Sequence, residues 1–191
     1  LAGFFSLYTT KNLSCLGDGG IITTNDKKLA DTVRSIGNCG RDLKGNHVQF
    51  GITSRLNTVN AAIARVQLKH LDEWNKKRQN LRDVYAKNLP PTHILSQGVC
   101  HQMVIKLSRP ELRSNFMNFL KNRGVQTGIH YPVPLHLQKP FRDIKTICPI
   151  AIDLSNRIVS LPMSPKLTKK EVLKVCEHIQ SWYDLREGEY L

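Results

Sequence analysis

The chain has 191 residues, enough for one large or two small domains, and its 40% hydrophobic and 23% charged residues are an ordinary globular composition. No apolar run approaches the roughly 18 residues that a membrane helix needs, and the first residues lack the basic lead and cleavage site of a secretory signal, so neither class is indicated. The net charge of +13 raises the hypothesis of nucleic-acid binding. The charge is spread evenly, however, with 14 basic and 7 acidic residues in 1–95 and 14 basic and 8 acidic residues in 96–191. This even distribution favours a solvated basic surface and an anionic small substrate over nucleic acid.

Short strands and loops are expected at the start of the chain. Apolar residues predict a strand over Phe4–Tyr8, and β-branched residues predict a second over Gly19–Thr24, with a polar, glycine-rich loop between them. Asp26 is then expected to cap a helix whose apolar positions fall at helical spacing. The following residues 37–51 contain four glycines and little periodicity, which predicts a loop.

A long helix comes next. From Leu56 to Tyr85, apolar residues recur at spacings near three and four, while basic residues occupy the other face. Pro90 and Pro91 cannot continue a helix and mark the best domain boundary. The sequence therefore predicts two domains, residues 1–88 with a long linking helix and residues 89–191.

The second domain is expected to alternate strands and helices. A strand over Val99–Leu107 places His101 in an apolar setting, as a core histidine with satisfied hydrogen bonds. Ser108–Glu111 has the spacing of a capping box that opens a helix ending at Gly124, and a strand over Val125–Tyr131 follows.

The remainder continues this alternation. A short helix is expected near Ile150–Arg157, followed by a strand over Ile158–Leu161. Thr168–Glu171 is a second capping box, which opens a final helix through Trp182. Strands that alternate with helices imply an α/β fold class.

The cysteines and the first residue bear on the setting of the protein. Five cysteines stand at positions 15, 39, 100, 148 and 176, an odd number without any Cys-x-x-Cys pair. Neither a disulfide framework nor a zinc or other metal site is therefore indicated, and a reducing, cytoplasmic localisation fits best. The chain begins with Leu1 rather than Met, and we expect its reading frame to start earlier.

A lysine lies where covalent chemistry is feasible. Lys11 follows an apolar strand and precedes a glycine-rich stretch. Schiff-base chemistry needs an amine in a dry, rigid site, so that its neutral form can attack. Ser6 offers a hydroxyl for a phosphate oxygen. By spacing alone, a lysine in a loop is more often a solvated surface charge.

Several segments, in the same order, resemble the DegT/DnrJ/EryC1/StrS family of nucleotide-sugar aminotransferases. These segments are Phe5–Leu13 with Leu16–Gly20, Thr23–Asp26, Ser54–Asn75, Gly124–Gln138 and Ser160–Thr168. The resemblance covers nearly the whole chain and identifies it as the C-terminal portion of such an enzyme. It implies the aspartate-aminotransferase-like fold of pyridoxal phosphate enzymes, with an incomplete large domain and a small C-terminal α/β domain.

By this resemblance, Lys11 is the catalytic lysine that holds pyridoxal 5′-phosphate and moves a proton, and Ser6 contacts the cofactor phosphate. The family is dimeric, and in many members an Asn before Ser-Arg-Leu reaches the cofactor phosphate of the partner subunit. Thr53 stands at the matching position and keeps a hydroxyl that can donate a hydrogen bond.

Substrate contacts are expected at the end of a strand beside a proline-rich turn. His130, Tyr131 and His136 lie there. For His130 and Tyr131, packing at the domain interface is an equally weighted alternative, and for His136 a structural role is somewhat favoured.

The resemblance implies transfer of an amino group, from glutamate, to a nucleotide-linked keto-deoxysugar, with C3 favoured over C4. Lys11 argues against a related dehydratase, which has His at this position. The family's N-terminal half supplies a phosphate loop, a stacking aromatic ring and an Asp for the pyridine nitrogen, and these are not in residues 1–191. The expected partners are therefore a second copy or a complementary N-terminal half. The alternative is a catalytically inactive fragment or split-gene product that acts in dimerisation or regulation.

Overall fold

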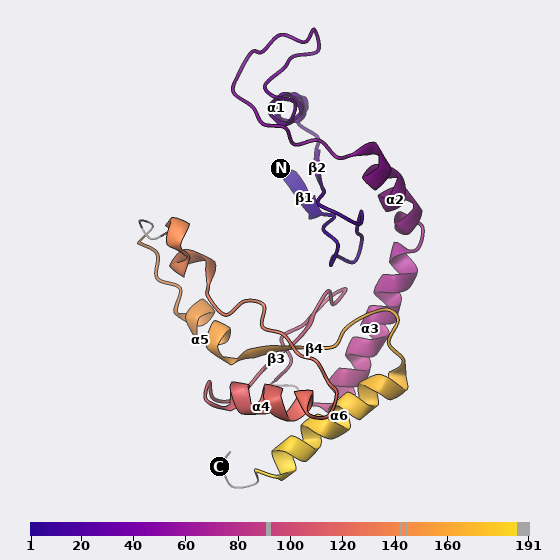
Figure 1. Cartoon of the computed structure of the whole chain (residues 1–191), viewed down its shortest axis with the longest axis vertical. Helices are drawn as coiled ribbons and strands as arrows, with labels where there is room; N and C mark the ends of the chain where they lie inside the picture. Colours follow the sequence, from indigo (N-terminus) through magenta and orange to yellow (C-terminus); the bar gives the residue numbers. More distant parts are fainter. Residues whose placement is uncertain (91–92, 142, 144, 187–191) are drawn as a thin grey trace. The chain divides into compact units, whose positions relative to one another are not determined.

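A computed structural model of the chain describes residues 1–90, 93–141, 143 and 145–186. The chain divides into two compact units, Leu1–Glu73 (unit 1) and Trp74–Leu191 (unit 2), whose elements are labelled in Figure 1. The sequence places the boundary at residue 88 instead. The difference concerns helix α3 (Leu71–Asn88), because its Leu81 and Tyr85 belong to the core of unit 2.

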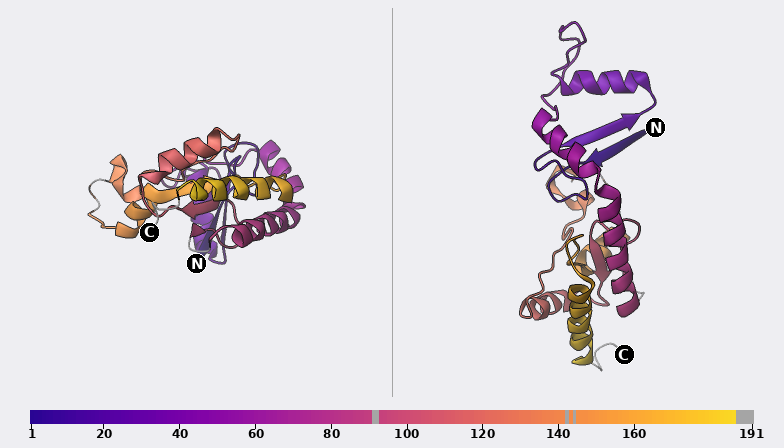
Figure 2. Two further views of the ribbon diagram at one scale, coloured as in Figure 1. Left: turned by 90° about the horizontal axis from the view of Figure 1, so that it is seen from below. Right: turned by 90° about the vertical axis from the view of Figure 1, so that its right-hand side faces the viewer.

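Unit 1 contains two strands and two helices. Strands β1 (Ala2–Ser6) and β2 (Gly20–Thr24) pair in antiparallel register, with Phe4 opposite Ile22, and they run side by side in Figure 2. Helices α1 (Lys27–Gly37) and α2 (Thr58–Leu68) follow. Strand β1 ends before Leu7, although the sequence predicts a strand over 4–8. Leu7 is 1% exposed and packs with Cys15 and Ala64 in a small buried cluster instead of extending the ladder.

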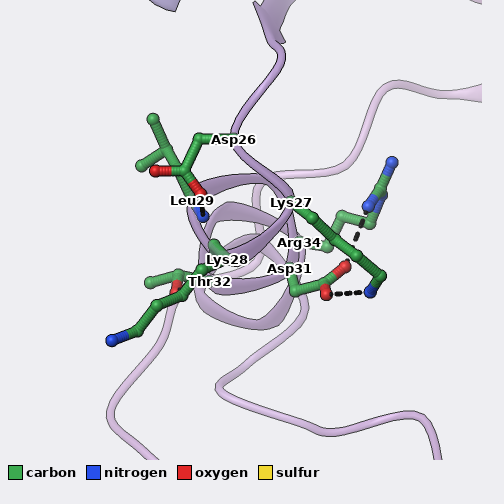
Figure 3. A network of polar contacts seen from close by, with 7 residues as sticks. All are labelled: Asp26, Lys27, Lys28, Leu29, Asp31, Thr32 and Arg34. Atoms are coloured by element: carbon green, nitrogen blue, oxygen red, sulfur yellow. Dashed lines mark hydrogen bonds and ion pairs between the residues drawn. The ribbon is translucent and has the colours of Figure 1, made fainter. Parts of the chain in front are cut away.

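Helix α1 is held by local polar contacts. As expected from the sequence, Asp26 is its N-cap, and the carboxylate accepts a hydrogen bond from the backbone N–H of Leu29 at 3.1 Å. Along the helix, the Asp31 carboxylate pairs with Lys27 at 2.6 Å and with Arg34 at 3.2 Å, and Figure 3 shows both cations pointing toward it. The hydrogen bond from Lys27 keeps the pKa of Asp31 below its usual value. The helix buries no residue.

The expectation of a single long helix from Leu56 to Tyr85 is wrong, because the structure has two helices in this range. Helix α2 ends at Leu68 and α3 begins at Leu71. Between them, the N–H of Lys69 donates to Val66 and that of His70 to Gln67, so the last turn tightens into i to i−3 bonds. No Gly or Pro marks this break in the sequence.

Unit 2 is built around a second antiparallel pair, β3 and β4. Met103 lies opposite Leu161, and helix α4 contacts both β4 and helix α6. The bounds of its elements are β3 (Met103–Lys106), α4 (Leu112–Lys121), the 3-10 turns η2 (Leu135–Leu137) and η3 (Lys139–Phe141), α5 (Pro149–Arg157), β4 (Ile158–Leu161) and α6 (Lys169–Asp184).

The core of unit 2 is continuous and includes polar groups with partners. The rings of Phe116 and Trp182 meet edge to face at 4.9 Å, and the Trp182 indole N–H donates to the Asn115 side chain at 2.9 Å. The Tyr85 hydroxyl donates to the Pro162 carbonyl at 2.9 Å, and burial raises the pKa of this phenol well above its usual value.

Local details of unit 2 confirm some sequence expectations and correct others. The capping box Thr168–Glu171 is present in full, with both reciprocal hydrogen bonds. The box expected at Ser108–Glu111 is wrong, because Glu111 is the N-cap of α4 and makes no side-chain cap bond. The strand expected over Val125–Tyr131 is also wrong, since it reduces to a bridge between Gly128 and Ser160. His101 precedes β3 and is half-buried rather than a core residue.

All five cysteines are free thiols. Over the described ranges, no helix has both the length and the apolar character needed to cross a membrane. Within the same ranges, no group of three or more His, Cys, Asp or Glu side chains is arranged to hold a metal ion.

Candidate functional site

Lys11 lies on a loop of unit 1, and a single residue, Leu7, makes the backbone hydrogen bonds that fix this loop. The buried Leu7 donates its N–H to the carbonyl of Gly19 at 2.8 Å and accepts from the N–H of Cys15 at 2.9 Å. Within the loop, the Lys11 N–H donates to the Tyr8 carbonyl at 2.9 Å and closes a turn. Lys11 itself is half-buried. The backbone that carries this amine is therefore tied down on both sides.

The same loop (residues 7–19, the lysine loop) is packed against helix α2. Buried Ser14 contributes both its N–H, at 3.3 Å, and its hydroxyl, at 3.2 Å, to the Gln67 side-chain oxygen. A Cβ at Gly19 would lie 2.6 Å from the Cys15 sulfur and 2.9 Å from a Leu56 methyl carbon, so this close approach needs glycine. Ser14 and Gln67 were not among the site residues expected from the sequence, because their contact joins positions 53 residues apart.

Ser6 and Thr53 line one groove of unit 1. The groove has a volume of about 830 Å³, and its walls also include Asp18, Arg55 and apolar residues of β1 and β2. Lys11 is not among the residues that line it. The Ser6 hydroxyl accepts a hydrogen bond from the Tyr8 N–H at 3.3 Å, which keeps its own hydrogen available to a ligand. The structure thus brings together two of the three expected cofactor residues around one space.

Thr53 belongs to a loop held by backbone bonds to the end of α1. It forms a bridge with Asn38, and its hydroxyl lies 3.3 Å from the Cys39 sulfur. At the tip of the loop, the Asp42 carboxylate accepts from the backbone N–H groups of Lys44 and Asn46, both at 2.9 Å. The bond from Asn46, the largest of these effects, lowers the pKa of Asp42. The loop is exposed, and its shape comes from these short-range bonds.

The three expected substrate residues lie in unit 2. The His130 ring nitrogen Nδ1 is 2.9 Å from the hydroxyl of buried Ser160, which also exchanges two backbone hydrogen bonds with Gly128. A Cβ at Gly128 would lie 2.9 Å from the His130 ring, so this glycine leaves room for the imidazole. Ser160 and Gly128 position His130, and neither was singled out by the sequence for this role.

Tyr131 and His136 line a cavity of unit 2 with a volume of about 290 Å³, together with residues of helix α5. Tyr131 is 70% exposed. The Nε2 atom of His136 is buried and has no hydrogen-bond partner among the described residues. A polar atom in this condition is costly unless a ligand or water satisfies it. His130 is not among the residues that line this cavity.

Comparison with known proteins gives a consistent result. The family model described as DegT/DnrJ/EryC1/StrS aminotransferase family matches residues 1–180. The chain is 38% identical over 180 residues to the erythromycin biosynthesis sensory transduction protein EryC1 of Saccharopolyspora erythraea, covering 88% of this chain and 48% of that protein. It is 35% identical over 190 residues to the dTDP-3-amino-3,4,6-trideoxy-alpha-D-glucose transaminase of Streptomyces venezuelae, covering 93% and 49%.

A solved structure agrees with these relatives. The crystal structure of S. venezuelae DesV in complex with a ketimine intermediate superposes with a TM-score of 0.86 at 32% identity, covering 95% of this chain and 51% of that one. The chain therefore spans about half the length of the relatives it matches. This confirms the expected fold, in an incomplete form.

Proposed function

The chain belongs to the DegT/DnrJ/EryC1/StrS aminotransferase family, and on that premise we propose that it supplies the cofactor lysine of a pyridoxal phosphate-dependent nucleotide-sugar aminotransferase. The observation that carries the proposal is the placement of Lys11, half-buried on a loop that Leu7 fixes at both ends. Because the chain spans about half the length of its relatives, we assign the activity to an assembled protein and not to this segment alone.

The residues present fit the cofactor. A fixed loop carries a primary amine, and Ser6 lines a groove of unit 1 with a hydroxyl that can donate to a phosphate, although Lys11 does not line the same groove. At Gly20, which also lines the groove, a Cβ would lie 3.3 Å from the Phe5 carbonyl oxygen, so a side chain there would crowd the paired strand. When bound, pyridoxal phosphate supplies an electron sink for the reacting carbon.

Each residue has a separate task in this proposal. Lys11 holds the cofactor covalently and moves a proton, which requires an amine whose backbone does not shift during the reaction. The Ser6 hydroxyl accepts from the Tyr8 N–H, so its hydrogen can donate to a phosphate oxygen. Thr53 donates in the same way, toward the cofactor of a partner subunit.

For the substrates, we propose an amino-acid donor, glutamate, and a nucleotide-linked keto-deoxysugar that is aminated at C3. The assignment to C3 is supported by the 3-amino sugar in the name of the S. venezuelae relative. His130, Tyr131 and His136 contact the sugar nucleotide. The excess of basic residues, 28 against 15 acidic ones, suits a polyanionic substrate.

We also propose that unit 1 associates with a second copy or a complementary half. Its two strands expose large apolar side chains, with Phe4 at 74% and Phe5 at 57% exposure. Exposed large apolar side chains on both faces of a strand pair favour association. Sedimentation of the 191-residue chain should therefore show self-association, or a complex once the complementary half is added. A chain that stays monomeric at high concentration and does not bind the complementary half would contradict the proposed association.

The test of the reaction uses the chain co-expressed with the complementary half of the S. venezuelae relative. We expect a yellow complex, and borohydride reduction should leave a pyridoxyl group on the peptide that contains Lys11, read by mass spectrometry. Lys11→Ala should remove this label while circular dichroism stays unchanged, because a loop amine contributes little to stability. Lys44→Ala, in an exposed loop of the same unit, is the matched control.

Two outcomes separate this proposal from its alternatives. A complex that keeps full amino transfer after Lys11→Ala would overturn the assignment of the lysine. A complex that forms without acquiring any label would favour the inactive fragment, acting as a dimerisation or regulatory partner. The isolated chain should give no transamination, because it lacks the residues that orient the cofactor ring.

A further inference from the structure

A cavity of about 290 Å³ lies in unit 2, apart from the residues that the proposed function uses. It lies between one face of α6 and the turn after α4, with Tyr85 and Pro162 on its wall. Glu171, Lys174 and His178 of α6 all face it, which follows from their spacing of three and four residues. Its volume is at the lower end of the range for small-molecule sites.

One polar atom at the cavity lacks a partner. His178 lines it, and the buried Nε2 of this residue makes no hydrogen bond to any described residue. Imidazole carries a donor or an acceptor at each nitrogen, and burying either unsatisfied costs free energy. A ligand oxygen placed in the cavity would remove this cost.

The charges around the cavity favour an anion. Arg123 and Lys174 line it, and among the described residues the ion pairs involve neither of them, although Arg123 donates to the Phe119 carbonyl at 3.4 Å. The Arg123 guanidinium stacks 3.5 Å from the centre of the Phe119 ring. Glu171 is the one acidic lining residue, but its carboxylate accepts from the N–H and the hydroxyl of Thr168, both at 2.7 Å. It is therefore held in the helix cap and stays charged, so the lining carries two cations against one carboxylate and keeps an excess of positive charge.

The rest of the lining is apolar. Val125, Leu167, Val172 and Val175 contribute to it. We propose that this cavity is a binding site for a small organic carboxylate, with its apolar body against these side chains and its carboxylate toward Lys174, Arg123 and His178. An inorganic anion would leave the apolar wall uncovered, and a cation would meet two like charges. The site goes beyond the proposed aminotransferase reaction and does not depend on it.

The experiment titrates the 191-residue chain with benzoate, without cofactor, and follows backbone amide resonances and calorimetric heat. Benzyl alcohol and benzylamine are the neutral and cationic probes of similar shape. We expect benzoate to shift the amides of α6 and of residues 123–126, and to bind about tenfold more tightly than benzyl alcohol, because a charge-assisted hydrogen bond is worth about that factor. Benzylamine should not bind.

Variants assign the binding to this cavity. Lys174→Gln and Arg123→Gln should each weaken benzoate roughly tenfold, whereas Lys170→Gln, on the same helix outside the cavity, should leave it unchanged. His178→Phe should weaken it too, and His178→Gln should restore part of the affinity. Both cationic positions are exposed, so these variants keep the fold. Equal affinity for benzoate and benzyl alcohol, or indifference to Lys174→Gln and Arg123→Gln, would overturn the proposal.

Discussion

Among the described residues, eighteen buried side chains of unit 2 form one core, which includes Phe116 and Trp182. The buried cluster of unit 1 has three members in the same part of the chain, Leu7, Cys15 and Ala64. Large apolar side chains of unit 1 are exposed instead, among them Phe4, Phe5 and Phe50. Hydrophobic burial is the dominant favourable contribution to folding. Unit 2 therefore has the means to fold cooperatively on its own, whereas unit 1 depends on local hydrogen bonds and, as proposed above, on association.

The two units differ in role, because the large core lies in unit 2 and the proposed cofactor residues lie in unit 1. Lys11, Ser6 and Thr53 all lie in the unit with the smaller core. Their positions come from hydrogen bonds between backbone groups and from glycines that permit close approach. Variants that damage the core of unit 2 should consequently cost global stability, and variants in unit 1 should act on the site.

The largest expected effect is in the core of unit 2. Trp182→Ala removes a side chain that is 1% exposed, its edge contact with Phe116 and its hydrogen bond to Asn115. We expect a loss of about 3–5 kcal/mol in the free energy of unfolding, measured with denaturant on the 191-residue chain. Phe5→Ala in unit 1 should cost well under 1 kcal/mol, since the ring is 57% exposed. Equal losses at the two positions would break the comparison.

A pair of glycines tests the exposed loop of unit 1. Both Gly40 and Gly45 have positive φ, 76° and 90°, but a Cβ at Gly40 would lie 1.8 Å from the Gln49 carbonyl oxygen, and one at Gly45 would meet nothing within 4 Å. Gly45→Ala should cost about 1 kcal/mol of local strain and Gly40→Ala clearly more. Amide hydrogen exchange over residues 38–53 measures both. If the amides of residues 38–53 exchange at the same rate in the two variants, the contact at Gly40 has no influence on the loop.

A matched pair of helix caps gives a smaller effect. Thr168→Ala removes the cap of α6, which buries five residues, including Trp182, in unit 2. It should lower the free energy of unfolding by about 1 kcal/mol. Asp26→Ala removes the equivalent bond from α1, which buries none, so it should fray that helix without moving the global transition. Helicity by circular dichroism and the denaturant midpoint separate the two effects.

The smallest effect concerns acid stability. His93 stacks on the Tyr183 ring, and burial, followed by the charge of Lys106, lowers the pKa of this imidazole. The folded state binds this proton less readily than the unfolded state. The contribution is therefore fully present above the unfolded pKa of about 6.5 and is lost as the pH falls from there through the lower folded pKa. His93→Gln should flatten the loss of stability below that pH. An unchanged slope would show that other groups govern it.

Much of the secondary structure was predictable, because its signals are local. Asp26 and Thr168 cap helices as expected, and β4 spans the four residues expected for it. The errors arise where tertiary contacts decide. Leu7 leaves the strand because it packs with Cys15 and Ala64, and only Gly128 of the expected strand 125–131 pairs with Ser160.

The candidate site shows the same division. Resemblance of ordered motifs was enough to predict the family, and the comparisons confirm it. The assignments of Lys11, Ser6 and Thr53 stay predictions, although two of these residues line one groove. Ser14, Gln67 and Ser160 could not be singled out, because each acts through a residue at least 30 positions away in the chain.

The amino-acid sequence by itself determined the α/β class, most helix ends and the family, since periodicity, capping residues and motif order are properties of neighbouring residues. Only the tertiary structure decided that α3 joins the core of unit 2, that Leu7 fixes the lysine loop, and that His178 faces a cavity without a partner among the described residues. The physical reason is that burial and hydrogen-bond satisfaction depend on which distant segments meet, and this is settled by packing rather than by local preference.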